Sequence, residues 1–251
     1  MDGIIGHTGF VGSNLIKSMK FDYMYNTKNI SQISEHEYNL LVCSGIPSLK
    51  WYANKYPKED LENIDKLIEC LDDVNCENFV LISTIDVYEE TFNNQSHVKC
   101  SENHHSYGRN RHHAEIELKK IFGDKLVILR LPAVFGNNLK KNVLYDLMNN
   151  ELYGRLNLCD KYQWYDVREL WKDIDFVLKD KFKFFVELNL FSEPIVLKEI
   201  VDKFFPNIDS SKLYYDCDDA IKYDLTTNYF INNYWYCKNT VFRKMKNYLH
   251  E

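Results

Sequence analysis

The chain has 251 residues, of which 45% are hydrophobic and 27% charged, a composition typical of a globular protein that buries one large core. Its formal net charge of −6 argues against nucleic acid as a partner. The sequence has no apolar run long enough to span a bilayer and no room for a signal peptide before its first strand, so we expect a cytoplasmic protein without a membrane partner.

Cysteine and histidine favour neither a disulfide framework nor a metal site. The seven cysteines are odd in number and include no Cys-x-x-Cys pair, so we expect reduced thiols. The pairs His104-His105 and His112-His113 have no cysteine or acidic partner at ligand spacing. We therefore expect solvated histidines on a loop and a helix surface, and no metal.

The chain opens with a short apolar strand, Met1–Ile5, which leads into three glycines at a spacing of three and a helix predicted over Gly12–Met19. Gly6 can take the positive φ of a tight turn, Gly9 lets the backbone approach a pyrophosphate, and Gly12 lets the helix pack on the strand. The N–H groups at the helix start then face the anion. Three glycines often form only a turn, but the strand before and the helix after them favour a nucleotide site.

Short apolar runs alternate with helical segments through the first half of the chain. The runs are nearly continuous and rich in β-branched and aromatic residues, as expected for strands buried on both faces. After the first strand, further strands are predicted over Tyr23–Tyr25, Leu40–Cys43, Asn78–Ser83 and Leu126–Leu131. Helices are predicted between them over Asp60–Asp73 and Tyr107–Phe122. This alternation indicates an α/β fold with a doubly wound, Rossmann-type parallel sheet.

The pattern changes after Gly136. Later elements are predicted as helices over Asn142–Asn150 and Leu197–Phe204, and as a strand over Val186–Leu190. We therefore expect a dinucleotide-binding Rossmann domain over residues 1–136 and a small C-terminal substrate lobe over residues 137–251, with some elements of the lobe returning to the first domain.

A pair of hydroxyl groups, Ser83 and Thr84, ends the fourth predicted strand. Ligands of doubly wound sheets bind at the carboxyl ends of the strands. A hydroxyl there can hydrogen-bond a substrate oxygen. The alternative is a strand end that caps its own backbone.

A helix opens at Tyr107, and Arg111 lies on the same helical face because the two residues are four apart. A guanidinium near a phenol stabilises the phenolate and lowers its pKa. A tyrosine tuned in this way can exchange a proton with a carbonyl or hydroxyl oxygen. The alternative is a surface stack of the two side chains.

The order of these motifs is more specific than any one of them. The glycine loop, the hydroxyl strand end and the tyrosine helix are followed by Leu129–Gly136, and Asn189–Pro194 fits the same group. Over about residues 1–136 the chain resembles the extended short-chain dehydrogenase/reductase family, the NAD(P)-dependent epimerases, dehydratases and reductases of nucleotide sugars. In character it is most similar to the small 4-keto-sugar reductases.

The resemblance implies roles for the matching residues. The cofactor pyrophosphate would be held by Gly6, Gly9, Phe10, Val11 and Gly12. Thr84 would contact the sugar oxygen, and Tyr107 would act as acid or base. The family's lysine, four residues after the tyrosine, binds the nicotinamide ribose and depresses the tyrosine pKa. Arg111 stands there, which keeps the positive charge but cannot give up its proton.

Cofactor preference is predicted from the end of the second strand. Sites that prefer NAD carry an acid there, whereas this chain reads Tyr25-Asn26-Thr27-Lys28-Asn29. Lys28 can meet a 2′-phosphate, so NADP(H) is expected over NAD(H); the alternative is a solvated loop lysine. The remaining predicted cofactor-binding residues are Asn26, Lys28, Ser44 and Arg111.

The expected reaction is the NADPH-dependent reduction of a keto group, at C4, on a nucleotide-linked sugar. Ile85 interrupts the acidic pair of the family's 4,6-dehydratases and leaves only Asp86, which disfavours dehydration. Two alternatives stay open: an epimerase that retains NAD, and a non-catalytic dinucleotide-binding subunit that the change of lysine to arginine would suit. The resemblance also implies a homodimer formed through the helices over Asp60–Asp73 and Tyr107–Phe122.

Overall fold

The computed structural model describes residues 1–92, 98, 100–150, 156–179, 186–227 and 233–251. The chain divides into two compact units, here called the sheet unit and the small unit. The sheet unit comprises Met1–Glu89, His97–Leu131 and Val167–Leu188. The small unit comprises Glu90–Ser96, Pro132–Asp166 and Asn189–Glu251.

The sheet unit is built on a six-stranded sheet with the order β10-β5-β4-β3-β1-β2. Its strands are β1 (Asp2–Ile5), β2 (Tyr23–Tyr25), β3 (Glu37–Cys43), β4 (Asn75–Thr84), β5 (Leu126–Leu131) and β10 (Val186–Asn189). The pairings of β1 with β2 and β3, and of β4 with β3 and β5, are all parallel. The predicted α/β, Rossmann-type sheet is confirmed.

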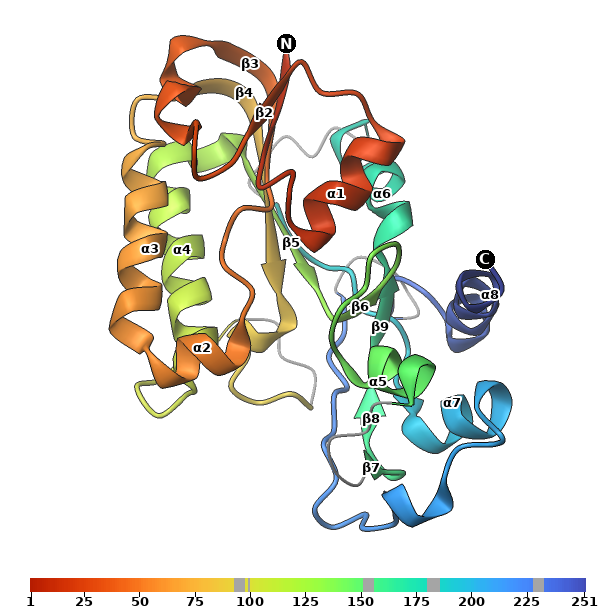
Figure 1. Ribbon diagram of the computed structural model, residues 1–251. Helices are drawn as coiled ribbons and strands as arrows, with labels where there is room; N and C mark the ends of the chain where they lie inside the picture. The colour runs from red at the N-terminus through yellow and green to blue at the C-terminus, as the bar shows by residue number, and fades with distance from the viewer. Residues whose placement is uncertain (93–97, 99, 151–155, 180–185, 228–232) are drawn as a thin grey trace. The chain divides into compact units, whose positions relative to one another are not determined.

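Helices cover both faces of this sheet (Figure 1). The helices α3 (Pro57–Glu69) and α4 (Ser106–Phe122) pack together on one face, and α1 (Phe10–Ser18) and α6 (Leu170–Lys179) lie on the other. A short helix, α2 (Lys50–Lys55), precedes α3. The apolar side chains of α3 and α4 join those of the strands in one core because helical periodicity gathers them on a single stripe of each helix.

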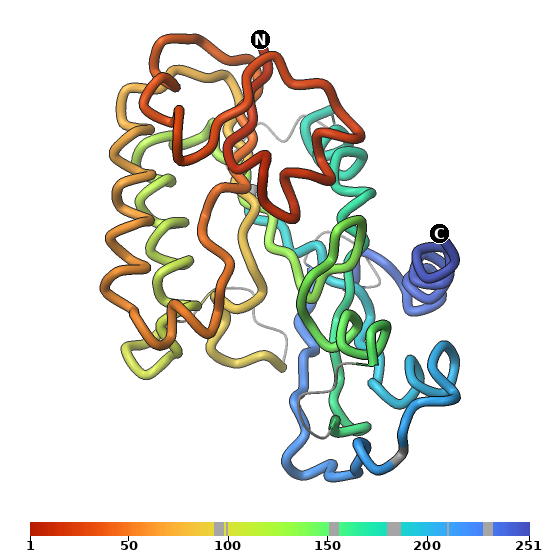
Figure 2. The backbone as a smooth tube through the Cα atoms, viewed as in Figure 1, coloured from red at the N-terminus to blue at the C-terminus, as the bar shows by residue number. Residues whose placement is uncertain are grey.

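Part of the sheet unit comes from late in the chain. The predicted strand after residue 186 is present as β10, which pairs with β5 at the edge of the sheet. Figure 2 shows the segment of α6, in cyan, beside the red first helix, and an edge-to-face contact joins the rings of Phe21 and Trp171 at 6.3 Å between centroids. The domain boundary at residue 136 stays a prediction.

The small unit has short strands and three helices over its described residues. The strands are β6 (Ala133–Phe135), β7 (Leu156–Asn157), β8 (Lys161–Tyr162), β9 (Trp164–Asp166), β11 (Ile195–Val196) and β12 (Leu213–Tyr214). They pair as β6 with β9, β7 with β12 and β8 with β11. The helices are α5 (Val143–Asn149), α7 (Leu197–Phe204) and α8 (Lys238–Leu249), which pack around the buried Trp164.

Five 3₁₀ turns lie in the described residues: η1 (Ile30–Glu35), η2 (Ile85–Val87), η3 (Gly123–Lys125), η4 (Val167–Glu169) and η5 (Ser210–Lys212).

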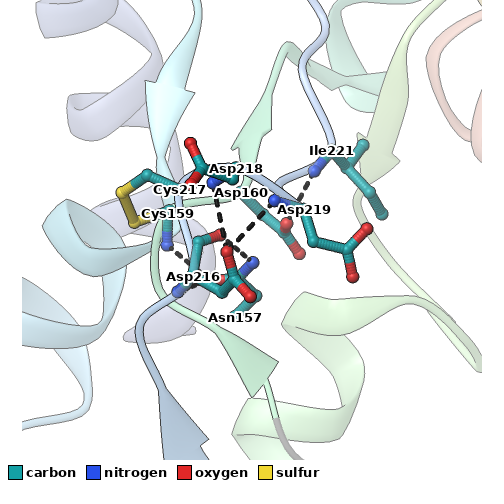
Figure 3. Close-up of a disulfide and its surroundings, with 8 residues drawn as sticks. All are labelled: Asn157, Cys159, Asp160, Asp216, Cys217, Asp218, Asp219 and Ile221. Carbon is teal, nitrogen blue, oxygen red and sulfur yellow. Dashed lines mark hydrogen bonds between the residues drawn. A yellow bond between two sulfur atoms is a disulfide. The ribbon is translucent and has the colours of Figure 1, made fainter.

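A disulfide in the small unit corrects the expectation of seven reduced thiols. Cys159 and Cys217 are bonded; they are 58 positions apart in sequence, with 5.1 Å between their Cα atoms (Figure 3). The neighbouring Asn157 side chain fixes the same two loops, because it donates to the Asp216 carbonyl at 2.6 Å and accepts from the Asp216 N–H at 3.1 Å. The spacing of cysteines alone did not reveal this pair because β7 and β12 bring them together only in the folded chain.

Candidate active site

The glycine loop joins β1 to α1 and has no room for larger residues at two of its three glycines. Gly6 has a φ of +83°, and a Cβ there would lie 2.6 Å from the Ser44 carbonyl oxygen. A Cβ at Gly12 would lie 2.2 Å from the Gly6 carbonyl oxygen. The predicted tight turn at Gly6 and the predicted close packing of the helix at Gly12 therefore each have a steric basis.

The start of α1 suits an anion. Gly9 is its N-cap residue and offers no side-chain cap, and the first turn, which begins with Phe10 and Val11, carries no acidic residue. The first N–H groups of a helix have no partner within the helix and carry the positive end of its dipole. A diphosphate fits such a loop, since its oxygens accept from backbone N–H groups.

The turn after β2 is closed by its own asparagines. The Asn29 side chain accepts from the Asn26 N–H at 2.8 Å, and the Asn26 side chain accepts from the Lys28 N–H at 2.8 Å. Lys28 is exposed, and its ammonium has no ion pair among the residues that the structure describes. His7 of the glycine loop is bonded through Nδ1 to the Tyr25 carbonyl at 3.0 Å. The loop and the turn thus meet at the carboxyl end of β2.

Ser44 follows β3 directly. Its hydroxyl donates to the Ile5 carbonyl at 2.9 Å, and its N–H donates to the same oxygen at 2.9 Å. The residue therefore holds the carboxyl end of β3 against that of β1, beside the glycine loop.

Thr84 is the last residue of β4, and its hydroxyl caps the backbone turn that follows it. Its Oγ1 accepts from the Asp86 N–H at 3.2 Å, which caps the turn η2, and its side chain lies beside that of Tyr107. Asp86 in turn binds the Lys50 ammonium of α2 at 2.8 Å, and His105 lies 3.9 Å from the same carboxylate oxygen. Tyr107 and Thr84, 23 positions apart in sequence, are thus brought together.

Tyr107 lies in the first turn of α4 and is 8% exposed. Its N–H donates to the Asn54 side chain of α2 at 2.9 Å, and the cap of the helix is the His105 ring, which accepts from the Gly108 N–H. Burial raises the pKa of Tyr107 to about 12, although the Arg111 guanidinium and the Thr84 side chain act to lower it. The predicted effect of Arg111 has the expected sign, but desolvation is larger.

The Arg111 guanidinium lies over the Tyr107 ring, with its Cζ 4.0 Å from the ring centroid. It is 3% exposed and forms a two-pronged ion pair with the buried Asp60 of α3, at 2.5 Å for Nη1–Oδ2 and 3.0 Å for Nη2–Oδ1. The predicted contact between Tyr107 and Arg111 is therefore present as a buried stack rather than a surface one.

Sequence reasoning missed the partners that other elements supply. Asp60 and Lys50 come from α3 and α2, and nothing in the sequence near Arg111 or Asp86 marks them. The expectation of solvated histidines is wrong for His104, which is buried and bonds through Nε2 to the Asp86 carbonyl at 2.7 Å. Burial and the Lys50 ammonium also lower the pKa of His105 to about 4, so its ring is neutral at physiological pH.

Two general features complete the description. Within the described ranges, no group of three or more His, Cys, Asp and Glu side chains is arranged to hold a metal ion. No helix in that part of the chain is long and apolar enough to cross a membrane.

Comparison with known proteins gives matches by structure. No protein-family model and no curated protein matches the sequence. A double mutant of dTDP-glucose 4,6-dehydratase from Streptomyces venezuelae, with NAD bound, matches over 100% of this chain and 97% of its own, with a TM-score of 0.73 and 13% identity. The fold is that of the extended short-chain dehydrogenase/reductases.

Two further solved structures share this extended short-chain dehydrogenase/reductase fold. The dTDP-4-dehydrorhamnose reductase from Yersinia enterocolitica matches over 99% of this chain and 98% of its own, with a TM-score of 0.67 and 12% identity. The UDP-glucose 4-epimerase from Thermotoga maritima, with UDP-glucose bound, matches over 89% of this chain and 90% of its own, with a TM-score of 0.68 and 11% identity. The fold predicted from the motifs is thus confirmed, while these enzymes differ in the reaction they are named for.

Proposed function

We propose that this protein is an NADPH-dependent reductase of a keto group, at C4, on a nucleotide-linked sugar. The observation that carries the proposal is that Thr84 and Tyr107 lie together at the carboxyl end of β4, in the same unit as a glycine loop that suits a diphosphate. Ligands of such sheets bind at this edge. The proposal also rests on the fold, which enzymes named for nucleotide-sugar chemistry share.

The residues of this chain would divide the work. Bound NADPH would supply the hydride. Thr84 would hold the carbonyl oxygen of the sugar, and Tyr107 would donate the proton to that oxygen as it becomes a hydroxyl. Because burial raises the pKa of Tyr107 to about 12, the phenol is protonated at physiological pH and is ready to act as a donor.

The preference for NADPH over NADH is proposed from the turn after β2. The turn has no carboxylate that would bind a ribose hydroxyl or repel a phosphate, and it carries the exposed Lys28. The backbone of that turn is held by Asn26 and Asn29, so Lys28 extends from a fixed base. A 2′-phosphate would gain a charge-assisted contact there.

The reaction is a reduction rather than a dehydration because the acid beside Thr84 is engaged. Elimination of water from a sugar needs one group to take a proton and another to release the hydroxyl. Ile85 is apolar and buried, and the Asp86 carboxylate is bound to the Lys50 ammonium at 2.8 Å.

The test is turnover with a panel of nucleotide-linked 4-keto sugars carrying UDP or dTDP. We expect loss of NADPH absorbance in a one-to-one ratio with the keto sugar consumed, and protein that purifies largely without cofactor. Stoichiometric NAD that stays bound through purification, with no net oxidation of NADPH, would show an epimerase instead. Cofactor binding with no turnover on any sugar of the panel would favour the non-catalytic subunit. The homodimer stays a prediction, which sedimentation of the purified protein would decide.

A further inference from the structure

The guanidinium of Arg111 directs its N–H groups to acceptors within the protein. Nη1 donates to Asp60 Oδ2 at 2.5 Å and to the Tyr107 carbonyl at 3.4 Å. Nη2 donates to Asp60 Oδ1 at 3.0 Å and to the Pro47 carbonyl, which also accepts from Nε at 3.1 Å. An arginine has five N–H donors, and these five contacts account for all of them.

Asp60 is also bonded on several sides. It is 2% exposed, and in addition to both prongs of Arg111 it accepts from the Asn110 side-chain amide at 2.8 Å. Asn110 also donates to the Pro57 carbonyl at 3.0 Å. Asp60 therefore fixes two consecutive side chains of α4 from the neighbouring helix, and a buried carboxylate of this kind is retained only where it is fully paired.

We propose that Asp60 is a positioning residue for Tyr107: it holds Arg111 stacked on the phenol ring and offsets the guanidinium charge, so that a buried ion pair sets the proton affinity of the tyrosine. The proposal rests on the proposed function in one respect, that Tyr107 is the proton donor. Under this proposal Arg111 stacks on the Tyr107 ring, and its guanidinium has no N–H left to bind a cofactor ribose.

The groups that face Tyr107 come from four elements. Arg111 on its own helix and Thr84 at the end of β4 favour the phenolate, while Asp86 in η2 and Asp60 in α3 disfavour it. The His105 ring lies 6.3 Å from the tyrosine ring between centroids and is neutral at physiological pH. The Lys50 ammonium offsets the negative charge of Asp86. In the same way, the Asp60 carboxylate offsets the positive charge of Arg111. Replacement of Asp60 by asparagine keeps a side-chain oxygen that can accept from Arg111 and removes the negative charge, so it should lower the pKa of Tyr107.

The test measures the ionisation of Tyr107 without substrate or cofactor. Protein is labelled with 3,5-difluorotyrosine, whose lower phenol pKa brings the titration into a range where the fold persists. The ¹⁹F resonance of Tyr107 is assigned by its absence from Tyr107→Phe. In Asp60→Asn we expect the pKa of Tyr107 to fall by about one pH unit relative to the unsubstituted protein.

The matched control is Asp65→Asn. Asp65 lies on the same helix and also pairs with a side chain of α4, at 2.8 Å to His113 Nε2, but this pair is only partly buried. We expect no shift of the Tyr107 titration there. An equal shift in both variants would mean a general effect of charge, and an unchanged or raised pKa in Asp60→Asn would overturn the proposal.

A second pair of variants keeps the test decisive if Asp60→Asn is unstable. The single variant Arg111→Met leaves a buried carboxylate unpaired, whereas Asp60→Asn with Arg111→Met removes both charges and is easier to fold. Arg111→Met should raise the pKa of Tyr107, and the double variant should bring it back down. Equal values in these two variants would show that Asp60 has no effect of its own.

The outcome is independent of the reaction. If the titrations shift as expected but no keto sugar is reduced, Asp60 sets the proton affinity of Tyr107 and the proposed function is wrong. If reduction occurs but the titrations do not depend on Asp60, the positioning role is wrong and the function stands. In an active enzyme, Arg111→Met should in addition leave the Kd for NADPH nearly unchanged, because no N–H of Arg111 is directed at the cofactor.

Discussion

At the scale of single residues, the site depends on groups whose chemistry differs from that in water. Tyr107 is the clearest case, since a surface phenol would begin to ionise near pH 10 and this one has its pKa raised to about 12. The glycines, Thr84 and Tyr107 could be predicted from sequence because each lies at the end of a local element. Asp60 and Lys50 could not be predicted, because their partners Arg111 and Asp86 come later in the chain by 51 and 36 positions.

Replacement of Tyr107 by phenylalanine should reduce kcat about 10²- to 10⁴-fold, the usual contribution of a general acid. The ring for Arg111 to stack on is retained, so the Kd for NADPH should change little. Steady-state kinetics and cofactor titration measure the two effects separately. Tyr215→Phe, at an exposed tyrosine of the small unit, is the control. A Tyr107→Phe protein with normal turnover would exclude the tyrosine as the proton donor.

Lys28→Ala should weaken NADPH binding by roughly tenfold and leave NADH binding unchanged, because one charge-assisted contact to the 2′-phosphate is lost. Fluorescence titration of both cofactors against both proteins gives the four constants. Lys20→Ala, at another exposed lysine, should alter neither. A preference of the unsubstituted protein for NADH would contradict the proposed cofactor.

At the scale of elements, α4 is the helix on which the site and the core both depend. Tyr107 and Arg111 lie in its first turns, and Glu115, four residues later, binds the buried Arg130 of β5 at 2.7 Å and Ser83 of β4 at 2.5 Å through its carboxylate. The helix was predicted from the sequence, with a start one residue too late. The buried ion pairs of this helix were not predicted, because an acidic residue within a helix is usually solvated.

Gly108→Ala should separate α4 from η2. A Cβ at this position would lie 2.1 Å from the Asp86 carbonyl oxygen and 2.1 Å from His104 Nε2, which are themselves hydrogen-bonded. We expect a loss of stability of about 1–3 kcal/mol from the forced displacement and a fall in kcat, since Tyr107 is the preceding residue. Urea unfolding measures the stability and steady-state kinetics measure kcat. The control is Ile116→Ala, at an exposed residue of the same helix. Unaltered kcat would mean that the start of α4 tolerates movement.

Glu187 should make the sheet unit sensitive to acid. Burial alone would raise its pKa, but Arg130 at 2.6 Å and Lys119 at 3.4 Å outweigh burial and hold the pKa below its usual range. A depressed folded-state pKa gives stability that is present above the unfolded value, near pH 4.3, and is lost as pH falls through the folded value.

Glu187→Gln should therefore lower the urea midpoint at pH 7, and the difference from the unsubstituted protein should shrink as the pH falls below about 4. Chemical unfolding at a series of pH values gives the comparison. Glu69→Gln, at an exposed end of α3, is the control. A difference that stays constant with pH would show that the carboxylate charge is not what stabilises the pair.

At the scale of the whole molecule, the sequence predicted the sheet unit better than the small unit. The strands β1 to β5 are short apolar runs that periodicity detects, whereas β7, β8, β11 and β12 have two residues each and leave no pattern. The bond between Cys159 and Cys217 was missed for the same reason, since it depends on those pairings.

Loss of the disulfide should lower the stability of the small unit. In the loop-entropy model, a disulfide between cysteines 58 positions apart restricts the unfolded chain and so stabilises the folded state by about 4 kcal/mol. Cys159→Ala with Cys217→Ser should lower Tm, and dithiothreitol should lower the Tm of the unsubstituted protein but not that of the double variant. Cys237→Ser, at an exposed free cysteine, is the control. An identical Tm with and without reductant would mean that the bond does not form in solution.

The late origin of β10 has a consequence for how the chain is made. Until residue 189 has left the ribosome, β5 is an open sheet edge, and Arg130 on it lacks one of its two carboxylate partners. An unpaired edge strand is a template for pairing with other chains. The chain must therefore be synthesised through β10 before this edge is covered, and a nascent chain that stalls earlier leaves the edge exposed to chaperones and to aggregation.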